Sequence, residues 1–530
     1  MTNKPKQLGL NCSVFEDLIK GNCVYIDKTK IIHELITTGI RQFYFISRPR
    51  RFGKSLLIST LKSIFSGEKE LFKQYWIGQK TDYDWQKYPI IHLDFGGIAH
   101  GNSQEFKQSL CFALQRIAND HGIENLRGIA PGDMLQDLVQ TLKTNGKIIL
   151  LIDEYDKPLV DHITNISIAE ENRAILNNFY TTVKSLETNW RAVFITGVSK
   201  FTKTSLFSGL NNIQELTFDP QIAELFGYTY HDLITYLDTP INDLAQELHV
   251  TKDDILKKIT LWYDGYRFSK DMRKAPMYNP LSVIACLDKK EFANYWFDTG
   301  TPGFLIPLLR TKREALEIPE IIKVPAGSFN AFDIKNISLY ALLVQTGYLT
   351  ITAYDPETQF FTLDYPNLEV RTSFKNYLLE AFAYTNSGDI ANKCAQMVAA
   401  IESKDFEKFF DTVKAFFANM PYNLHVAQEA HYHALFHLLF DVLGMQPKSE
   451  DASSQGRTDL VLETPDSIII FEFKLNSSVQ KALDQILQKK YYEKYLHKNK
   501  TIILMGVNFS FKNKKLTFAW LPSSNFTKAP

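Results

Sequence analysis

Four apolar runs separated by helical patterns occupy the first 230 residues. The runs are FYFIS (43–47), PIIHLDF (89–95), KIILLIDEYD (147–156) and RAVFITGVS (191–199). The helical patterns cover residues 54–66, about 103–120, about 132–144 and about 169–188. Apolar strands that alternate with helices are typical of a parallel sheet that is covered on both faces. The pattern therefore predicts an α/β domain over residues 1–230.

The pattern changes after this domain. Over residues 231–374 helical patterns dominate, broken by aromatic turns, which predicts a helical or winged-helix-like middle region. Residues 375–418 have a helical pattern that suits a spacer. From about residue 420 the pattern predicts a long helix, a β-hairpin and another helix. We expect residues 375–530 to form a second α/β domain with a helical lead-in.

Composition fits a folded protein of several domains but names no partner. Of the 530 residues 45% are apolar and 22% charged, and Lys plus Arg equals Asp plus Glu at 59 each. The five cysteines are scattered and form no C-x-x-C, so we expect a reducing compartment. The N-terminus has no apolar signal core, and no run approaches about 18 apolar residues. We expect a cytoplasmic protein that does not span a membrane.

The segment after the first apolar run, SRPRRFGKS (47–55), matches the second half of the phosphate-binding motif G-x-x-x-x-G-K-[ST]. Gly53 would let the backbone approach a phosphate. Lys54 would place its charge on the β- and γ-phosphates of ATP, and Ser55 its hydroxyl on Mg²⁺. The first glycine of the motif is replaced by Arg48.

The loop can still close without that glycine, since Pro49 fixes one φ angle. Its arginines, Arg48, Arg50 and Arg51, are then either phosphate ligands or solvated side chains. Both readings remain open at the level of sequence.

The apolar run IILLI ends in two carboxylates. Asp153 and Glu154 would lie at the carboxyl tip of a buried strand, where ligands bind in open α/β sheets. We expect Asp153 to hold Mg²⁺ and Glu154 to polarise the attacking water. Thr196 and Ser199 end the next strand and are suited to sensing a γ-phosphate. If that strand lies between the loop strand and the acidic strand, the domain is an ATPase of the type with a catalytic glutamate.

A second acidic site is predicted in GRTDLVLETPDSIIIFEFKLN (456–476). A tight turn at TPDS would place Asp459 opposite Glu472 in an antiparallel pair, with Lys474 on the same face as Glu472. Two opposed carboxylates repel each other in a sheet, and a bridging Mg²⁺ would offset this repulsion. Lys474 would then orient the water that attacks a phosphodiester. The alternative is an exposed sheet edge with solvated side chains.

At this point the chain resembles a known bacterial family, the predicted AAA-ATPase-like proteins with a C-terminal nuclease-like domain of the PD-(D/E)XK type. The resemblance covers nearly the whole chain. It rests on YIDKTKIIHEL (25–35), SRPRRFGKSLL (47–57), LIDEYDKPL (151–159), ITGVSKF (195–201), YDGYRFS (263–269), YNPLSV (278–283) and the C-terminal hairpin. In that family an R-P-R-R loop replaces the first glycine, so Arg48 is an expected variant. A role in defence or in the control of mobile elements would suit such an architecture.

The resemblance also suggests residues outside the hairpin. The upstream helix HVAQEAHYHALFHLLFDVLG is similar to the first helix of these nucleases, which implies that Glu429 joins the metal site. On the downstream helix Gln485 fits the A-x-x-Q-I pattern, whereas Gln488 with Tyr492 fits Q-x-x-x-Y; we favour Gln485. His433 and His437 are spaced to chelate zinc, but they lack a third ligand, so packing is favoured.

Charge favours a nucleic-acid surface locally. Ten lysines and two carboxylates lie between residues 474 and 515, a local excess of eight positive charges. The sequence thus predicts an ATP-controlled, Mg²⁺-dependent nuclease that acts on DNA rather than RNA. The alternatives are a nucleotide-dependent switch that binds nucleic acid or a partner without cutting, and a nuclease-like domain that serves only a homo-oligomer. The arginine finger is unassigned, and Arg267 is one candidate for nucleotide sensing.

Overall fold

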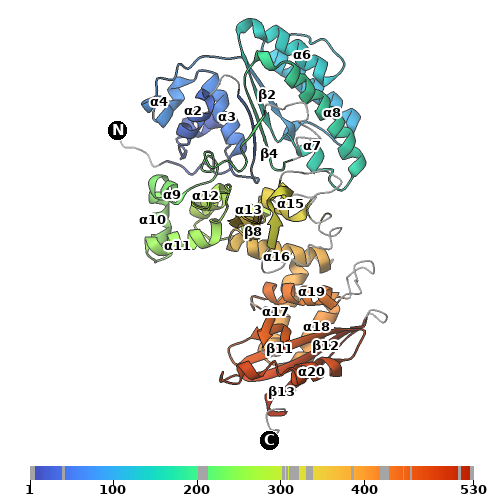
Figure 1. Cartoon of the computed structure of the whole chain (residues 1–530). Coiled ribbons are helices and arrows are strands. Elements are labelled where there is room, and N and C mark those ends of the chain that lie inside the picture. The colour runs from blue at the N-terminus through green and yellow to red at the C-terminus, as the bar shows by residue number, and fades with distance from the viewer. Residues whose placement is uncertain are drawn as a thin grey trace. The chain divides into compact units, whose positions relative to one another are not determined.

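The computed structural model forms two compact units. They comprise residues 1–308 with 320–371, and residues 309–319 with 372–530 (Figure 1). The residues that the structure describes are 6–38, 42–200, 213–300, 305, 308, 322–329, 338–383, 387–417, 429–445, 447–453, 456–510 and 515–525. In this part of the chain no helix combines the length and the hydrophobicity needed to cross a membrane.

A five-stranded parallel sheet forms the centre of the first unit, in the order β2-β3-β4-β1-β5. The strands are β1 (Gln42–Ser47), β2 (Ile90–Asp94), β3 (Ile148–Asp153), β4 (Trp190–Gly197) and β5 (Gln214–Glu215). β3 is buried at every position, which explains why its residues are apolar up to the terminal Asp153. β4 lies between β1, the strand before the phosphate-binding loop, and β3, the acidic strand. This is the strand order expected for an ATPase of the type with a catalytic glutamate.

Helices cover both faces of this sheet, as predicted. They are α1 (Phe15–Lys20), α2 (Thr29–Thr37), α3 (Lys54–Phe65), α4 (Trp76–Lys80), α5 (Ser103–Asp120), α6 (Pro131–Leu142), α7 (Lys157–Val160) and α8 (Ile166–Ser185). In Figure 1, α2, α3 and α4 lie on one side of the strands, and α6 and α8 lie on the other.

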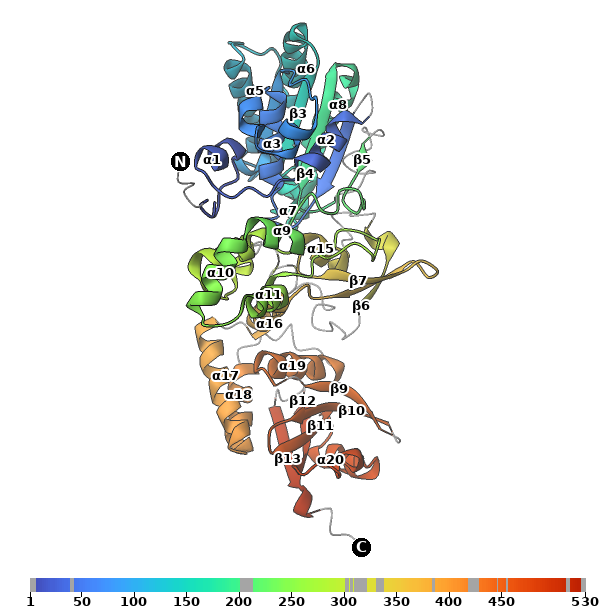
Figure 2. The ribbon, with the colours of Figure 1, turned by 90° about the vertical axis from the view of Figure 1, so that its left-hand side faces the viewer.

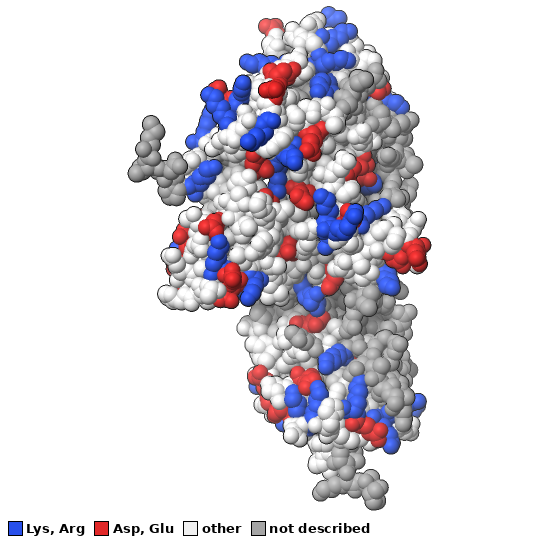
Figure 3. Space-filling model, turned by 60° about the vertical axis from the view of Figure 1, so that its left-hand side comes forward, with Lys and Arg blue, Asp and Glu red and all other residues white. Residues whose placement is uncertain are grey.

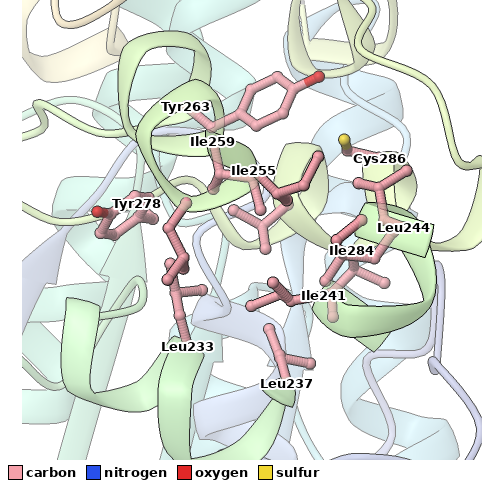
Figure 4. Packing of buried hydrophobic residues seen from close by; sticks show 14 of the residues in the cluster. Leu233, Leu237, Ile241, Leu244, Ile255, Ile259, Tyr263, Tyr278, Ile284 and Cys286 are labelled. Atoms are coloured by element: carbon pink, nitrogen blue, oxygen red, sulfur yellow. The ribbon is translucent and has the colours of Figure 1, made fainter. Parts of the chain in front are cut away.

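The same unit contains a mostly helical region with a small antiparallel sheet of order β6-β8-β7. Its elements are α9 (Tyr230–Tyr236), α10 (Asp238–Glu247), α11 (Lys252–Tyr263), α12 (Pro280–Lys289), α13 (Tyr295–Gly300), β6 (Ile322–Pro325), α15 (Leu339–Thr346), β7 (Thr350–Asp355) and β8 (Phe360–Asp364). We call the described residues 228–300, 305, 308, 322–329 and 338–371 the middle region. Its helices pack around Leu233, Ile241 and Ile259, which are fully buried (Figure 4). Thr229 and Thr251 cap α9 and α11 at their first turns.

The second unit is a mixed sheet between helices. Its helices are the larger part of α16 (Leu368–Ala383), which begins in the first unit, and α17 (Ser387–Glu402), α18 (Phe406–Phe417), α19 (Glu429–Val442) and α20 (Val479–Gln488). The sheet has the order β13-β12-β11-β10-β9, with strands β9 (Lys448–Ser453), β10 (Gly456–Glu463), β11 (Ser467–Leu475), β12 (Thr501–Ser510) and β13 (Lys515–Pro522). Among the described strand pairs of this sheet, β11 and β12 run parallel and the others antiparallel. The predicted hairpin is β10–β11, and β9, β12 and β13 extend it.

The two faces of this sheet carry different helices. On one face Phe436 of α19 packs against Phe473, with ring centres 5.0 Å apart. On the other face Ile486 of α20 packs with Ile468 and Ile470. Figure 2 shows α19 and α20 on opposite sides of β11 and β12. Because side chains alternate along a strand, the residues at even positions of β11 point to the face that α20 covers.

Candidate functional site

The phosphate-binding loop connects β1, which ends at Ser47, to α3. Gly53 has φ +91°, a conformation that favours glycine, and a Cβ there would meet nothing within 4 Å. Lys54 is 6% exposed, and its Nζ donates to the carbonyl oxygens of Arg48 and Pro49, each 3.0 Å away. The lysine therefore reaches back across the loop, and the space beside Gly53 is open.

Arg48 does not lie where a phosphate ligand would. Its guanidinium is 1% exposed and donates to the carbonyl oxygens of Thr217, at 2.6 Å, and Ser47. The same group lies 4.4 Å from the ring centre of Phe268 and 5.1 Å from that of Phe226. Burial lowers the pKa of Arg48 to about 9, so the group stays charged at pH 7. In this structure the Arg48 side chain holds the loop through these contacts, and its role as a phosphate ligand stays a prediction.

The other two arginines differ from Arg48 in their surroundings. The charge of Arg50 is close enough to act on both Lys54 and Asp161. Arg51 is exposed and takes the left-handed conformation, with φ +66°. Arg50 therefore lies in the neighbourhood of Lys54 and Asp161, whereas Arg51 faces solvent.

The carboxylates at the tip of β3 lie near Lys54. Asp153 is 4% exposed, and its Oδ1 accepts hydrogen bonds from the Thr196 hydroxyl at 2.5 Å and from the main-chain N–H of Glu154 at 3.0 Å. A Cβ on Gly96, just after β2, would lie 2.6 Å from Oε2 of Glu154. Burial lowers the pKa of Lys54, and the charges of Asp153 and Glu154 oppose this shift. The structure thus brings together Lys54, Asp153, Glu154 and Thr196.

Two neighbours of these carboxylates were not predicted from the sequence. Asp156 is 2% exposed and accepts hydrogen bonds from the N–H groups of Val198 and Ser199 and from the Ser199 hydroxyl. Ser199 is therefore a buried partner of Asp156 in this structure, and its role in sensing a γ-phosphate stays a prediction. Lys157 Nζ lies 3.9 Å from Oε2 of Glu154. The run D-E-Y-D-K contained both residues, but its periodicity does not show which acids are buried.

Arg267 and the first family segment have structural roles. The Arg267 guanidinium donates to the carbonyl oxygens of Met272, at 3.3 Å, and Lys274, so it closes its own loop. Asp27 in YIDKTK accepts hydrogen bonds from the N–H groups of Thr29 and Trp76, at 2.9 and 2.7 Å. These contacts tie α2 to α4, and they explain the segment without a catalytic role.

The hairpin in the second unit has the predicted register. Leu460 pairs with Phe471, and the same register continues to the residues next to the turn. One step away from the turn, this register places Asp459 opposite Glu472. The turn chemistry of TPDS was therefore sufficient to predict which residues face each other.

The side chains at this end of the hairpin form a compact group. The Asp459 Oδ2 atom accepts a hydrogen bond of 2.8 Å from the main-chain N–H of Phe473. Glu472 is 1% exposed, and its Oε1 accepts a hydrogen bond of 2.8 Å from Lys474 Nζ. Lys474 also donates to the carbonyl oxygen of Phe473 at 2.9 Å. Asp459 and Lys474 thus bind the main chain of Phe473, and Lys474 also binds Glu472.

The remaining predicted residues of α20 and the turn after it differ in their burial. Gln485 is half-buried on α20, which covers the face of β11 that carries Glu472 and Lys474. Gln488 is exposed, and Tyr492 packs against the apolar cluster below α20. This arrangement supports Gln485 over the alternative pair.

Glu429 is the first residue of α19, and its side chain lies outside the described residues. One turn later a ring nitrogen of His433 contacts the carbonyl oxygen of Asp459. His437 instead lies 3.3 Å from Asp441. The two histidines have different partners, in agreement with packing rather than zinc binding. Within the described ranges no three His, Cys, Asp or Glu side chains group to hold a metal ion.

The basic stretch is partly neutralised by a residue upstream of it. Glu463 binds Lys498 at 2.8 Å and Lys500 at 3.0 Å, and lies 3.8 Å from Lys448. The hydrogen bonds from Lys498 and Lys500 lower the pKa of Glu463 to about 2. On the face in Figure 3, acidic and basic side chains are interspersed. The local charge excess is therefore smaller than the count over residues 474–515 indicates.

Comparison with known proteins agrees with these two sites. Residues 9–207 match a family model described as a predicted AAA-ATPase, and residues 427–519 match one of the PD-(D/E)XK nuclease superfamily. An uncharacterized protein in the vnfD 5′ region of Azotobacter chroococcum mcd 1 is 32% identical over 516 residues, which cover 95% of this chain and 96% of that protein. The chain belongs to the family of predicted AAA-ATPase-like proteins that carry a C-terminal PD-(D/E)XK nuclease superfamily domain.

Proposed function

We propose that the chain is an ATP-controlled nuclease that hydrolyses phosphodiester bonds of DNA with the help of Mg²⁺. The observation that carries the proposal is the group formed by Asp459, Glu472 and Lys474 at the main chain of Phe473. A buried carboxylate needs a charged or hydrogen-bonding partner, and the group supplies one through Lys474. Such a group on an apolar strand is more than a solvated sheet edge.

The oxygen atoms of this group fit Mg²⁺. Carboxylates and main-chain carbonyls are the hard ligands that this ion prefers, and Asp459, Glu472 and the Phe473 carbonyl supply them. When bound, Mg²⁺ would withdraw charge from the scissile phosphate and lower the pKa of water. The Glu429 side chain is proposed as a further ligand. Gln485 is proposed to help position the substrate from α20.

The residues of the chain would carry out the remaining work. In hydrolysis a water oxygen bonds to phosphorus, the bond between phosphorus and the leaving sugar oxygen breaks, and that oxygen takes up a proton. Lys474 would orient the water with one of its N–H groups, because its ammonium lies among the carboxylate and carbonyl oxygens. Asp459 is held by the N–H of Phe473, which fixes its carboxylate at this end of the hairpin.

The first unit would supply the control through ATP. The open space beside Gly53 fits a phosphate, and Lys54 would exchange the two loop carbonyls for phosphate oxygens. Ser55 and Asp153 would hold Mg²⁺, and Thr196 would keep Asp153 in place. Glu154 would polarise the attacking water. Arg50 and Arg51 are proposed as ligands of the phosphates.

The test is cleavage of single- and double-stranded DNA and of RNA, with Mg²⁺ or with a chelator, and with or without ATP. We expect Mg²⁺-dependent cleavage of DNA that is lost in Asp459→Ala. Cleavage that survives unchanged in this variant would show that the hairpin is not the active site. Tight DNA binding without cleavage, unaffected by Glu472→Ala, would instead support a binding switch.

A further inference from the structure

The phosphate-binding loop is held by the middle region at several points. A Cβ on Gly347 would lie 2.8 Å from the Pro49 ring, and the Phe52 ring lies 4.7 Å from that of Tyr266. The indole Nε1 of Trp296 donates a hydrogen bond of 2.9 Å to a main-chain carbonyl of the loop, that of Arg50. A change in the loop backbone therefore acts directly on the middle region.

Trp296 connects this contact to a buried carboxylate. The side chain of Trp296 is fully buried, and its main-chain N–H donates to Oε1 of Glu369 at 2.6 Å. The other oxygen of Glu369 accepts a hydrogen bond of 2.7 Å from the Ser282 hydroxyl. Glu369 has no measurable exposure, and moving a buried charge from its donors is costly. Glu369 and Trp296 are thus expected to move together.

Glu369 is the second residue of α16, and the start of this helix is fixed in the first unit. Asn367 caps the helix through the N–H of Val370, and its amide donates to the Asp264 carbonyl at 2.8 Å. The division between the two units falls after Arg371, so α16 begins in the first unit and continues into the second.

Further along α16 the second unit provides an anchor. Lys375 binds Asp441 of α19 at 2.6 Å, and both side chains are mostly buried. Glu369 and Lys375 are six residues apart, a rise of about 9 Å along a helix. α19 also carries His433, whose ring contacts the Asp459 carbonyl. α16, whose Glu369 binds Trp296, is thus joined to α19 by an ion pair, and His433 of α19 contacts the Asp459 carbonyl.

We propose that Trp296 is a positioning residue of the phosphate-binding loop that, through Glu369, transmits the nucleotide state to α16. The inference rests on the proposed ATP binding. Its two-state element is Lys54, which binds the carbonyls of Arg48 and Pro49 in this structure and is proposed to exchange them for phosphate oxygens. That exchange frees the backbone segment whose next carbonyl, that of Arg50, is held by Trp296.

Hydrogen exchange of peptides that cover residues 368–383, in the full chain with and without ATP and Mg²⁺, tests the proposal without relying on cleavage. Trp296→Phe keeps an aromatic ring but removes the N–H. Trp190→Phe is the matched control, since the Trp190 indole is equally buried and donates to the Val183 carbonyl at 2.8 Å, away from the loop. Glu369→Gln is a second variant at the other end of the contact. Nucleotide affinity is measured for each protein.

We expect ATP to change the exchange rate of these peptides several-fold in the wild type and in Trp190→Phe. The change should be lost in Trp296→Phe and reduced in Glu369→Gln. If ATP binds to the wild type but leaves the exchange rate of these peptides unchanged, the inference is overturned and the proposed ATP binding is not. An unaltered response in Trp296→Phe, or an equal loss in Trp190→Phe, would also overturn it. Absence of ATP binding in the wild type would overturn the proposed function together with the inference.

Discussion

The guanidinium of Arg48 lies 4.4 Å from the centre of the Phe268 ring and donates to the Thr217 carbonyl. The arginine that replaces the first glycine of the phosphate-binding motif is therefore part of the core beneath the loop. We expect Arg48→Ala to lower the free energy of unfolding of the first unit by about 2–4 kcal/mol, because it leaves a cavity and an unpaired carbonyl. Denaturant unfolding measures this change.

Arg51→Ala is the matched control, since it removes the same side chain from an exposed position of the same loop. Its effect on stability should stay within about 0.5 kcal/mol. Equal destabilisation by the two substitutions would contradict the assignment of Arg48 to the core.

The buried pair of Glu472 and Lys474 predicts a specific pattern of stability. Lys474→Met removes the ammonium but leaves Glu472 buried, so the second unit should lose about 3–5 kcal/mol. Adding Glu472→Gln should restore most of this loss, because the uncompensated charge is gone. Neither the single nor the double variant should cut DNA. Stability that the second substitution does not restore would show that the two residues act independently.

The contact between His100 and Asp161 predicts a pH-dependent stability. Asp161 Oδ2 accepts a hydrogen bond of 3.1 Å from Nε2 of His100, and this bond raises the pKa of His100 above its usual value of about 6.5. A histidine whose pKa is raised in the folded state adds stability that is fully present below the pKa of the unfolded state. This stabilisation is lost as the pH rises through the pKa of the folded state. We therefore expect the Tm difference between wild type and His100→Gln to be larger at about pH 6 than at about pH 9.

The exposed His231 of α9 offers a control for this measurement. The Tm difference for His231→Gln should change much less over the same pH range. A His100→Gln difference that is constant with pH would contradict the role of the Asp161 contact.

Glu463 predicts how the basic stretch contributes to DNA binding. Glu463→Gln removes the charge that holds Lys498 and Lys500, so DNA affinity at low salt should rise several-fold and depend more steeply on salt. Glu493→Gln is the matched control, because Glu493 pairs with Lys490 at 3.0 Å and its substitution releases this one lysine. Fluorescence anisotropy with a labelled duplex at several salt concentrations compares them. Identical salt slopes in the two variants would exclude this surface from DNA binding.

The parts of the fold that sequence predicted are those in which local pattern and burial coincide. Residues 148–152 of β3 are all apolar because both faces of the sheet are covered, and the hairpin register follows from its turn. β9 has the polar sequence KSEDAS and lies at an edge of its sheet, so it carries no alternation that predicts a strand.

The missed features of the sites depend on contacts between distant residues. A motif predicts where the backbone of Arg48 runs, but the contact with Phe268, 220 positions later, decides which way its side chain points. Likewise, Ser199 is buried because Asp156 lies beneath the end of β4. Neither relationship has a periodicity or spacing that one sequence reveals.

We propose that ATP at the phosphate-binding loop controls a nuclease at the hairpin. The most direct test measures Mg²⁺-dependent DNA cleavage and ATP hydrolysis side by side in wild type, Lys54→Ala and Lys474→Ala. We expect Lys474→Ala to hydrolyse ATP but not to cut, and Lys54→Ala to lose ATP hydrolysis and the effect of ATP on cleavage. Cleavage that responds to ATP equally in wild type and Lys54→Ala, or that persists in Lys474→Ala, would contradict the account.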